Sequence, residues 1–415
     1  MTTKMEKKKP EHAPIIGFAP SEGELTIGGV KISQLAERVG STPFYAYDRA
    51  LITSRIEEMR KYLPQSLKIH YAMKANPMPA VVQHLSRIVD GLDLASTGEM
   101  AIALDTGMDP ALISFAGPGK TEQELSQAIA AGVVINMESF TEMENIARIA
   151  QQQGLKAKVA IRVNPDFELK SSGMKMGGGP QQFGVDAEQV PDMLKRLAQL
   201  GLEFIGFHIF SGSQNLKEES LLEAQEKTLA LAVSLSRHAP NAPKKVNIGG
   251  GYGIPYFPGD KALSLKNLGD GLSVLLKKFH ETLPDTEVVT ELGRFMVGEA
   301  GIYVTRVIDK KISRGEVYLI TDGGMHHHLA ASGNFGQLIR KNYPVAIANK
   351  LDGPVQEKVN IVGCLCTPLD RLGDKMILPV AEVGDYVVLF QSGAYGLSAS
   401  PTAFLGHPAP KEVLV

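Results

Sequence analysis

The sequence predicts an α/β protein made of a (β/α)₈ barrel and a C-terminal β domain. Its 415 residues are too many for one ordinary globular domain, which favours two domains. Between about residues 50 and 300, short apolar runs alternate with segments of helical periodicity, and eight such units match the size of a TIM-like barrel. After about residue 300 the pattern changes to β-rich runs separated by turns.

The eight predicted barrel strands are apolar runs that end in small or polar residues. They are Leu67–Met73, Gly91–Ala95, Leu112–Ala116, Val133–Met137, Lys158–Val163, Phe204–Phe210, Lys245–Ile248 and Glu287–Thr290. The segments between them, such as Glu122–Ala131 and Leu265–Thr282, carry apolar residues at helical spacing. Because periodicity does not show closure, a doubly wound open sheet is the alternative.

The remaining chain is predicted to form the second domain. Its expected strands are Gly301–Ile312, Glu316–Thr321, Pro344–Ala348, Gln356–Val362 and Asp385–Phe390. Two earlier runs, Leu25–Ile27 and Pro43–Tyr47, are expected to join the same sheet. The predicted organisation is therefore a disordered tail over residues 1–20, strands of the β domain over 21–47, the barrel over 48–300 and the β domain over 301–415.

The composition narrows the class of protein. Lys and Arg number 43 against 45 Asp and Glu, and this balance disfavours nucleic-acid binding. No stretch of about 18 uncharged apolar residues occurs, so no membrane span is predicted. The charged start of the chain does not fit a secretory signal, and a basic membrane-docking tail is its alternative interpretation. Cys364 and Cys366 cannot form a disulfide framework, which predicts a reducing, cytoplasmic location.

Polar residues stand where the predicted strands end. They are Lys74 and Asn76, Asp93 and Ser96, Arg162 and Asn164, His208–Gln214, Gly249–Gly253, and Glu291 with Arg294. In a (β/α)₈ barrel the carboxyl ends of the strands meet at one mouth, which holds the active site. The sequence therefore predicts one site built from distant segments.

Lys74 ends the first predicted strand. Desolvation at a barrel mouth lowers the pKa of a lysine and frees its amine for Schiff-base chemistry. A surface lysine just past a strand is the alternative. The neighbouring motifs favour the catalytic interpretation.

A glycine run and two charged residues suggest how a phosphorylated cofactor is bound. Gly249–Gly251 follows the seventh strand, where missing side chains let backbone N–H groups approach a phosphate, although a tight turn also explains the run. Ser213 and Arg294 are further candidate phosphate partners. A buried carboxylate such as Glu291 can hold a pyridine nitrogen protonated, and a structural ion pair with Arg294 is the alternative.

Six motifs in order carry a resemblance to a known family. They are Tyr71-Ala-Met-Lys-Ala-Asn76, Asp93-Leu-Ala-Ser96, Gly249-Gly-Gly251, Glu291-Leu-Gly-Arg294, Cys366-Thr-Pro-Leu-Asp370 and Gly393-Ala-Tyr-Gly396. From about residue 40 to 407 the chain resembles the fold-type III pyridoxal-phosphate decarboxylases, which act on diaminopimelate, ornithine or arginine. The resemblance implies an alanine racemase-like fold, pyridoxal 5′-phosphate (PLP) as cofactor, and a homodimer.

The resemblance also implies roles for individual residues. Lys74 would carry PLP as an internal aldimine, Glu291 would pair with the pyridine nitrogen, and Cys366 would protonate the substrate carbon in the other subunit's site. The residues implied to hold the cofactor further include Asp93, Arg162, Ser213, Gly250, Gly251, Arg294 and Tyr395.

The sequence departs from the family pattern in two places. The family's ring-stacking His aligns with Phe210, and His208 lies two residues earlier on the same strand face, so either ring can stack on the cofactor. After the cysteine, the family's Asp or Glu binds a distal ammonium, whereas this chain has Thr367. A threonine supplies no negative charge. Thr367 and Asp370 are the predicted substrate-binding residues.

The predicted substrate is therefore an α-amino acid or a conjugate without a distal cationic amine. The Cys-Thr-Pro-Leu-Asp variant resembles a subgroup acting on carrier-protein-bound or siderophore-type substrates, which includes exosortase-associated decarboxylases. An amino-acid racemase of the same fold, a non-catalytic PLP-binding protein and a cofactor-free Schiff-base aldolase are the alternatives.

A glycine-rich run and a run of three histidines are two further segments of interest. The glycine-rich run Ser171–Pro180 can cover the barrel mouth or serve as a connector. No metal site is predicted, because adjacent strand residues such as His326–His328 cannot all face one ion.

Overall fold

The computed structural model describes residues 12–168, 174–175, 177–335, 337 and 340–415. Within these ranges the chain forms two compact units. The barrel unit comprises Thr53–Ile254 and Ala262–Met296, and the β-rich unit comprises the residues up to Ile52, Pro255–Lys261 and Val297–Val415. Residues 1–11 of the predicted disordered tail lie outside the described residues. Of the predicted glycine-rich loop, residues 171–173 and 176 also lie outside them.

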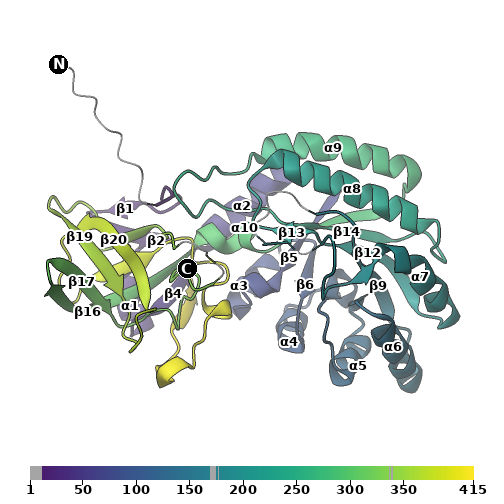
Figure 1. Ribbon diagram of the computed structural model, residues 1–415, viewed down its shortest axis with the longest axis horizontal. Helices are drawn as coiled ribbons and strands as arrows, with labels where there is room; N and C mark the ends of the chain where they lie inside the picture. The colour runs from purple at the N-terminus through teal and green to yellow at the C-terminus, as the bar shows by residue number, and fades with distance from the viewer. Residues whose placement is uncertain (1–11, 169–173, 176, 336, 338–339) are drawn as a thin grey trace, which may run out of the picture. The chain divides into compact units, whose positions relative to one another are not determined.

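Eight parallel strands close into a barrel, as predicted (Figure 1). They are β5 (Leu67–Ala72), β6 (Gly91–Leu94), β7 (Ile113–Phe115), β8 (Val134–Met137), β9 (Lys158–Asn164), β12 (Glu203–Ile209), β14 (Lys245–Gly250) and β15 (Glu287–Leu292). Hydrogen bonds join them in the order β9-β12-β14-β15-β5-β6-β7-β8, and β8 pairs with β9 to complete the ring. This closure excludes the open-sheet alternative.

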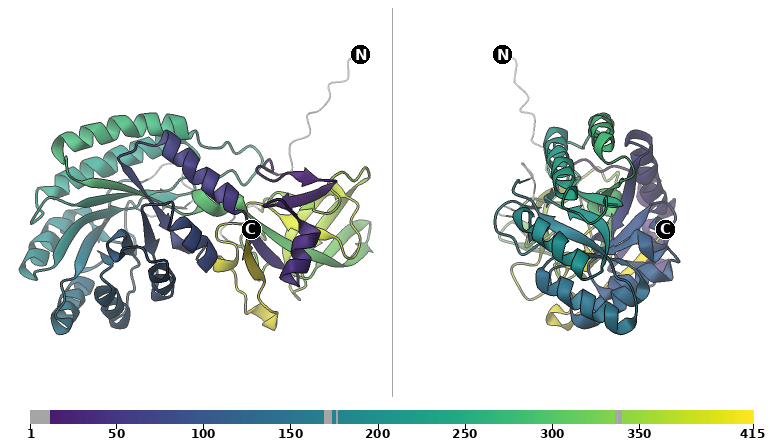
Figure 2. Two further views of the ribbon diagram at one scale, coloured as in Figure 1. Left: turned by 180° about the vertical axis from the view of Figure 1, so that it is seen from behind. Right: turned by 90° about the vertical axis from the view of Figure 1, so that its right-hand side faces the viewer.

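Helices alternate with the barrel strands and flank them (Figure 1). They are α2 (Arg49–Tyr62), α3 (Pro79–Leu85), α4 (Thr97–Asp105), α5 (Glu122–Ala131), α6 (Phe140–Gln153), α7 (Val190–Gln199), α8 (Glu218–Ser236) and α9 (Leu265–Thr282). Helices α8 and α9 pack side by side, as both figures show (Figures 1 and 2). The bounds of α5 and α9 are those predicted. A capping box fixes the start of α5, since Thr121 and Glu124 each bond to the other's backbone.

The β-rich unit contains a larger sheet with mixed strand directions. Its strands are β4 (Phe44–Tyr47), β16 (Gly301–Ser313), β17 (Glu316–Thr321), β18 (Val345–Ile347), β19 (Gln356–Val362), β20 (Arg371–Pro379), β21 (Tyr386–Leu389) and β22 (Lys411–Leu414). They run in the order β18-β21-β16-β17-β19-β20, with β4 paired to both β16 and β22. The two strands that the sequence did not predict are β20 and β22.

One predicted pairing is wrong. Strand β2 (Glu24–Ile27) lies between β1 (Pro20–Ser21) and β3 (Val30–Lys31) in a separate three-stranded sheet. It contacts the segment after β18 through one backbone bond, from Leu25 N to Ala348 O at 2.7 Å. Leu25 and Ile27 are buried in the apolar core of this unit, together with Phe44, Ile302 and Val388.

Several short helices and strands connect the longer elements. They are α1 (Ile32–Val39), β10 (Met174–Lys175), β11 (Val185–Asp186), β13 (Gly212–Ser213) and α10 (Arg294–Val297). Over the described ranges, none of the helices combines the length and the apolar character that a bilayer crossing requires.

Candidate active site

Lys74 lies just beyond the end of the first barrel strand. It is the central residue of a single 3₁₀ turn, Met73–Ala75, which follows β5. The missing side chain of Gly293 lets the end of β15 approach this turn, since a Cβ there would lie 2.8 Å from Ala75 Cβ. Lys74 Nζ lies 5.5 Å from the centroid of the Phe210 ring. The sequence predicted a desolvated Lys74, but its side chain is exposed in the structure. The reason is that the turn places it beyond the buried end of the strand.

Glu291 is a buried carboxylate with polar partners on two neighbouring strands. Its Oε2 accepts hydrogen bonds from His208 Nε2 at 2.8 Å and from Asn247 Nδ2 at 3.3 Å. Burial alone would raise the pKa of Glu291, but the hydrogen bond and charge of His208, with the charges of Lys74 and Arg162, lower it to about 2. Glu291 is therefore ionised at neutral pH.

The two predicted ring-stacking candidates occupy different environments. His208 belongs to β12 and is buried. Because an ionised carboxylate only accepts, the Nε2–H group of His208 donates the hydrogen bond to Glu291. The other ring nitrogen, Nδ1, is buried without a hydrogen-bond partner. Phe210 follows the strand, and its ring lies near the Lys74 amine. The structure thus brings Lys74, Phe210, His208 and Glu291 into one region of the barrel.

The glycine run forms the end of β14 and the turn after it. Gly249 and Gly251 have φ of 67° and 81°, in the left-handed region that favours glycine. Gly250 pairs with Glu291, and a Cβ at Gly250 would lie 2.0 Å from the Glu291 carbonyl oxygen. The run is therefore required by the packing of β14 against β15, and it also leaves a backbone surface without side chains beside Glu291.

Ser213 and Arg294 lie on segments that follow the strands. Ser213 belongs to β13, which pairs with β10, and it is half-buried. Arg294 is half-buried and begins α10, directly after β15. Both therefore follow the carboxyl ends of barrel strands, as predicted.

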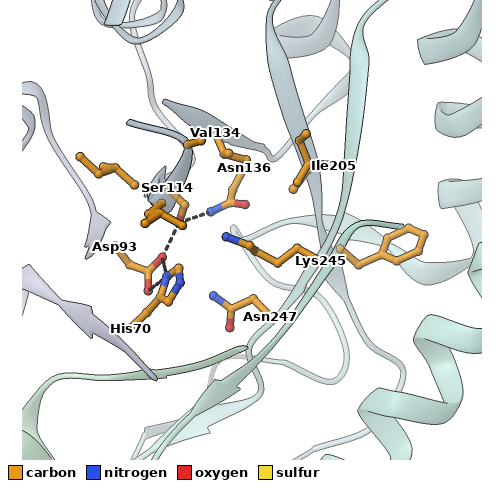
Figure 3. A pocket seen from close by; sticks show the side chains of 13 residues that line it. His70, Asp93, Ser114, Val134, Asn136, Ile205, Lys245 and Asn247 are labelled. Atoms are coloured by element: carbon orange, nitrogen blue, oxygen red, sulfur yellow. Dashed lines mark hydrogen bonds and ion pairs between the residues drawn. The ribbon is translucent and has the colours of Figure 1, made fainter. Parts of the chain in front are cut away.

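Asp93 and Arg162 have partners of their own inside the barrel. Arg162 Nη1 lies 2.9 Å from Glu138 Oε1, and both side chains are buried. Asp93 accepts a hydrogen bond from Ser114 Oγ and lies 3.4 Å from His70 Nδ1. Figure 3 shows Asp93 in a group of polar side chains. These side chains line a cavity of about 20 Å³. These contacts give both residues a place in the structural core of the barrel.

Four predicted site residues belong to the β-rich unit. Cys366 is exposed and Thr367 half-buried in the turn between β19 and β20. Asp370 ends this turn, and its buried carboxylate accepts Met325 N at 2.6 Å and Leu365 N at 2.8 Å. Tyr395 has φ of 53°, a left-handed conformation uncommon for a residue with a side chain. The contacts of Asp370 hold the base of the turn.

The residues at the ends of β12, β14 and β15 fit PLP. The ionised Glu291 suits a protonated pyridine nitrogen, and the buried Nδ1 of His208 has hydrogen-bonding capacity that the chain leaves unused. Glycines offer backbone without side chains, which suits a phosphate group. Lys74 supplies a primary amine.

Asn247 and Glu138 also belong to the barrel site, although no sequence motif indicated them. Asn247 bonds to Glu291, and Glu138 is the partner of Arg162. Their positions in the sequence could have indicated a role in the site, because each is a polar residue within or just after an apolar strand. Their partners lie 44 and 24 residues away, and sequence alone does not reveal such pairs.

Comparison with known proteins agrees with this arrangement. Residues 49–298 match the pyridoxal binding domain of the pyridoxal-dependent decarboxylases. An L-glutamyl-[BtrI acyl-carrier protein] decarboxylase from Niallia circulans is 37% identical over 94% of this chain and 92% of its own. A 2-[(L-alanin-3-ylcarbamoyl)methyl]-2-hydroxybutanedioate decarboxylase from Staphylococcus aureus is 31% identical over 92% of this chain and 96% of its own.

A solved structure shows the same fold. The diaminopimelate decarboxylase of M. jannaschi has a TM-score of 0.87 and 26% identity, over 96% of this chain and 92% of that one. The chain thus belongs to the pyridoxal-dependent decarboxylases, the family that its sequence resembles, and PLP is its cofactor.

Proposed function

We propose that this protein is a PLP-dependent decarboxylase of an α-amino acid conjugate without a distal cationic amine. The observation that carries the proposal is the ionised, buried carboxylate of Glu291, fixed by His208 within the barrel that also presents Lys74. A carboxylate at this position stabilises positive charge on a heterocyclic nitrogen. The family match over residues 49–298 supports the cofactor and the class of reaction.

Bound PLP supplies an electron sink for the pair of electrons left behind when the substrate carboxylate departs. Lys74 would hold the cofactor through its primary amine. Glu291 keeps the proton on the pyridine nitrogen, and Phe210 supplies the apolar ring nearest to the Lys74 amine. Backbone groups of Gly250 and Gly251, with Ser213 and Arg294, would bind the phosphate.

The protein acts as a homodimer in this proposal. Cys366 of the partner subunit donates a proton to the substrate α-carbon after carbon dioxide leaves. The exposure of Cys366 on a turn supports this role, because a donor in trans must be accessible to a second copy. A racemase of the same fold would instead return the proton with inversion of the α-carbon.

Thr367 is the basis for the substrate class. It is half-buried beside Cys366, and its hydroxyl accepts the Leu369 amide at 3.4 Å, so no negative charge is available there for an ammonium. The relative from Niallia circulans acts on an L-glutamyl group carried by an acyl-carrier protein. We therefore assign a conjugate of this kind, carrier-bound or siderophore-type, rather than a free diamino acid.

A carbon dioxide release assay tests the proposal. The holoenzyme is given free diaminopimelate, lysine and glutamate, and glutamate tethered to a carrier protein, with chiral analysis of recovered substrate. We expect release from the tethered substrate, retained configuration of unreacted substrate, and loss of release in Lys74→Ala. Release from free diamino acids alone would contradict the substrate class, and inversion without carbon dioxide would establish the racemase.

A matched pair of variants at the turn separates charge from size. Thr367→Glu restores an acidic group and should raise activity on free diamino acids by roughly tenfold or more, the worth of a hydrogen bond to a charged group. Thr367→Gln has similar size without the charge and should give no such gain. Equal gains in both variants would show that Thr367 does not select against a cationic substrate.

A further inference from the structure

Within the β-rich unit, three side chains bring metal-ligating atoms together. One ligand atom from each of His326, Cys364 and His407 lies within 4.8 Å of the others. Cys364 Sγ is 3.8 Å from His407 Nδ1, and the His326 and His407 rings have centroids 5.3 Å apart. His326 is fully buried, and the other two are half-buried.

His326 differs from the two histidines that follow it. Both ring nitrogens of His327 and both of His328 have hydrogen-bond partners within the fold. Neither ring nitrogen of His326 has one among the described residues, although its side chain is 0% exposed. A buried imidazole with no partner is costly, because it loses its hydrogen bonds to water without replacement. A ligand that binds His326 would remove this cost.

We propose that His326, Cys364 and His407 form a Zn²⁺ site with one coordination position open to water or another ligand. Zinc favours nitrogen and sulfur ligands in a tetrahedral arrangement, with Zn–N of about 2.0–2.1 Å and Zn–S of about 2.3 Å, which separates ligand atoms by roughly 3.5 Å. The observed Sγ to Nδ1 distance of 3.8 Å is close to that value. Coordination replaces the thiol proton of Cys364, so one proton is released for each ion bound.

The surroundings favour a cation. The carboxylates of Asp322 and Asp370 are close enough to Cys364 to act electrostatically on its thiol. The backbone carbonyl of Asp322 also lies 3.7 Å from Cys364 Sγ. Two negative groups beside a cysteine and two histidines offset the positive charge of a divalent ion.

The site joins three segments that are distant in sequence. His326 lies after β17, Cys364 after β19, and His407 after the turn Phe404–Gly406. Asp370 accepts amides from Met325 and Leu365, the neighbours of two of the ligands. The ion would therefore hold the base of the turn that carries Cys366.

The expectation that the histidine run has no metal role rested on a strand conformation. The structure places His326 and His327 in a turn, and their ring centroids lie 3.6 Å apart. Both ring nitrogens of His327 are taken up by Tyr303 and Pro408, so among the three histidines His326 is the one in the cluster. The other two ligands, Cys364 and His407, come from segments much further along the chain.

Metal analysis of the holoenzyme tests this site without an activity assay. The protein is incubated with Zn²⁺ alone, desalted, and examined by elemental analysis and zinc X-ray absorption. We expect about one zinc ion per chain, with one sulfur at about 2.3 Å and two imidazole nitrogens at about 2.0–2.1 Å. A zinc-free protein, or bound zinc without a sulfur ligand, would overturn the proposal.

Variants identify the ligands. Cys364→Ser should lose the sulfur ligand and weaken zinc binding at least about 100-fold, the upper end of the loss caused by removing an outer-shell partner. Cys366→Ser and His238→Gln, which change an exposed cysteine and an exposed histidine, should leave zinc content and coordination unchanged. Sulfur ligation that persists in Cys364→Ser, or disappears in Cys366→Ser, would refute the assignment. If Cys364→Ser does not fold, the wild-type spectrum still decides between the outcomes.

Discussion

The barrel end around Glu291 and the turn between β19 and β20 present their chemistry in opposite ways. In the barrel, Glu291 and His208 are buried on adjacent strands and bonded to each other. In the turn, Cys366 is exposed, and the buried residue, Asp370, bonds to backbone amides instead. In the proposed mechanism, strands therefore fix the groups that serve the cofactor, and a turn presents the groups assigned to the substrate.

This difference separates two kinds of effect. Changes in the barrel should alter the rate or stability for any substrate, because the strands position the cofactor. Changes in the turn should alter the choice of substrate or the local stability.

Replacing the buried carboxylate should have the largest effect. Glu291→Gln keeps the size of the side chain but removes the charge, and we expect kcat/KM to fall about 100- to 1000-fold, as for loss of a preorganised electrostatic group. Glu287→Gln changes the first residue of the same strand and should be near wild type. The measurement is the initial rate of carbon dioxide release at saturating PLP. Similar rates in both variants would remove Glu291 from the mechanism.

A methyl group at Gly250 should disrupt the contact of β14 with β15. Its Cβ would lie 2.0 Å from the Glu291 carbonyl oxygen, and we expect Gly250→Ala to cost about 3 kcal/mol or more of unfolding free energy, the upper end for overpacking. Gly98→Ala is the control, because the nearest atom to its added Cβ, Ser96 Oγ, is 3.7 Å away. Urea unfolding of both variants measures the difference. A fully stable Gly250→Ala protein would contradict the close strand approach.

Acid should weaken the fold through Glu291. Its folded pKa of about 2 lies below the ordinary 4.5, so its stabilising contribution is complete above about pH 4.5 and is lost as pH falls toward 2. We expect the stability gap between wild type and Glu291→Gln to shrink by on the order of 1–3 kcal/mol over that window. Urea unfolding at stepped pH values measures the gap. A gap that is constant or widens on acidification would show that the folded pKa is not depressed.

The smallest effect is expected at the turn. Asp370→Asn leaves a poorer acceptor for two backbone amides and should cost about 1–2 kcal/mol, the range for one buried unsatisfied donor. Substrate preference should not change, because Asp370 accepts one backbone amide from its own turn and one from the segment after β17. Asp374→Asn, on the partly exposed strand β20, is the control. A changed preference with unchanged thermal stability would instead make Asp370 a substrate-binding residue.

The barrel was predictable because its strands are apolar and its helices amphipathic. All eight barrel strands appear where apolar runs end in polar residues. Closure was not predictable in the same way, because it depends on the pairing of β8 with β9, which periodicity does not reveal. Strands β20 and β22 were not predicted. Strand β20 contains Gly373 and Asp374, and a residue with φ of 52°, Lys375, interrupts its pattern. Strand β22 is four residues long, and its two apolar residues, Val413 and Leu414, follow two charged ones, which is too short a run to predict a strand.

The site was predictable as a set of residues but not as a set of contacts. The resemblance indicated Lys74 and Glu291 from local motifs. The bond between His208 and Glu291 spans 83 residues and depends on the order of strands in the barrel. The exposure of Lys74 depends on a 3₁₀ turn that continues past the strand. The meeting of His326 with Cys364 and His407 likewise depends on tertiary packing.

The central claim is that PLP binds to Lys74 within the barrel. Reduction of the holoenzyme with borohydride, followed by protease digestion and mass spectrometry, tests it most directly. We expect a pyridoxyl group on the peptide that contains Lys74 and its disappearance in Lys74→Ala. A modified lysine elsewhere, or an unmodified Lys74 peptide from PLP-loaded protein, would contradict the account.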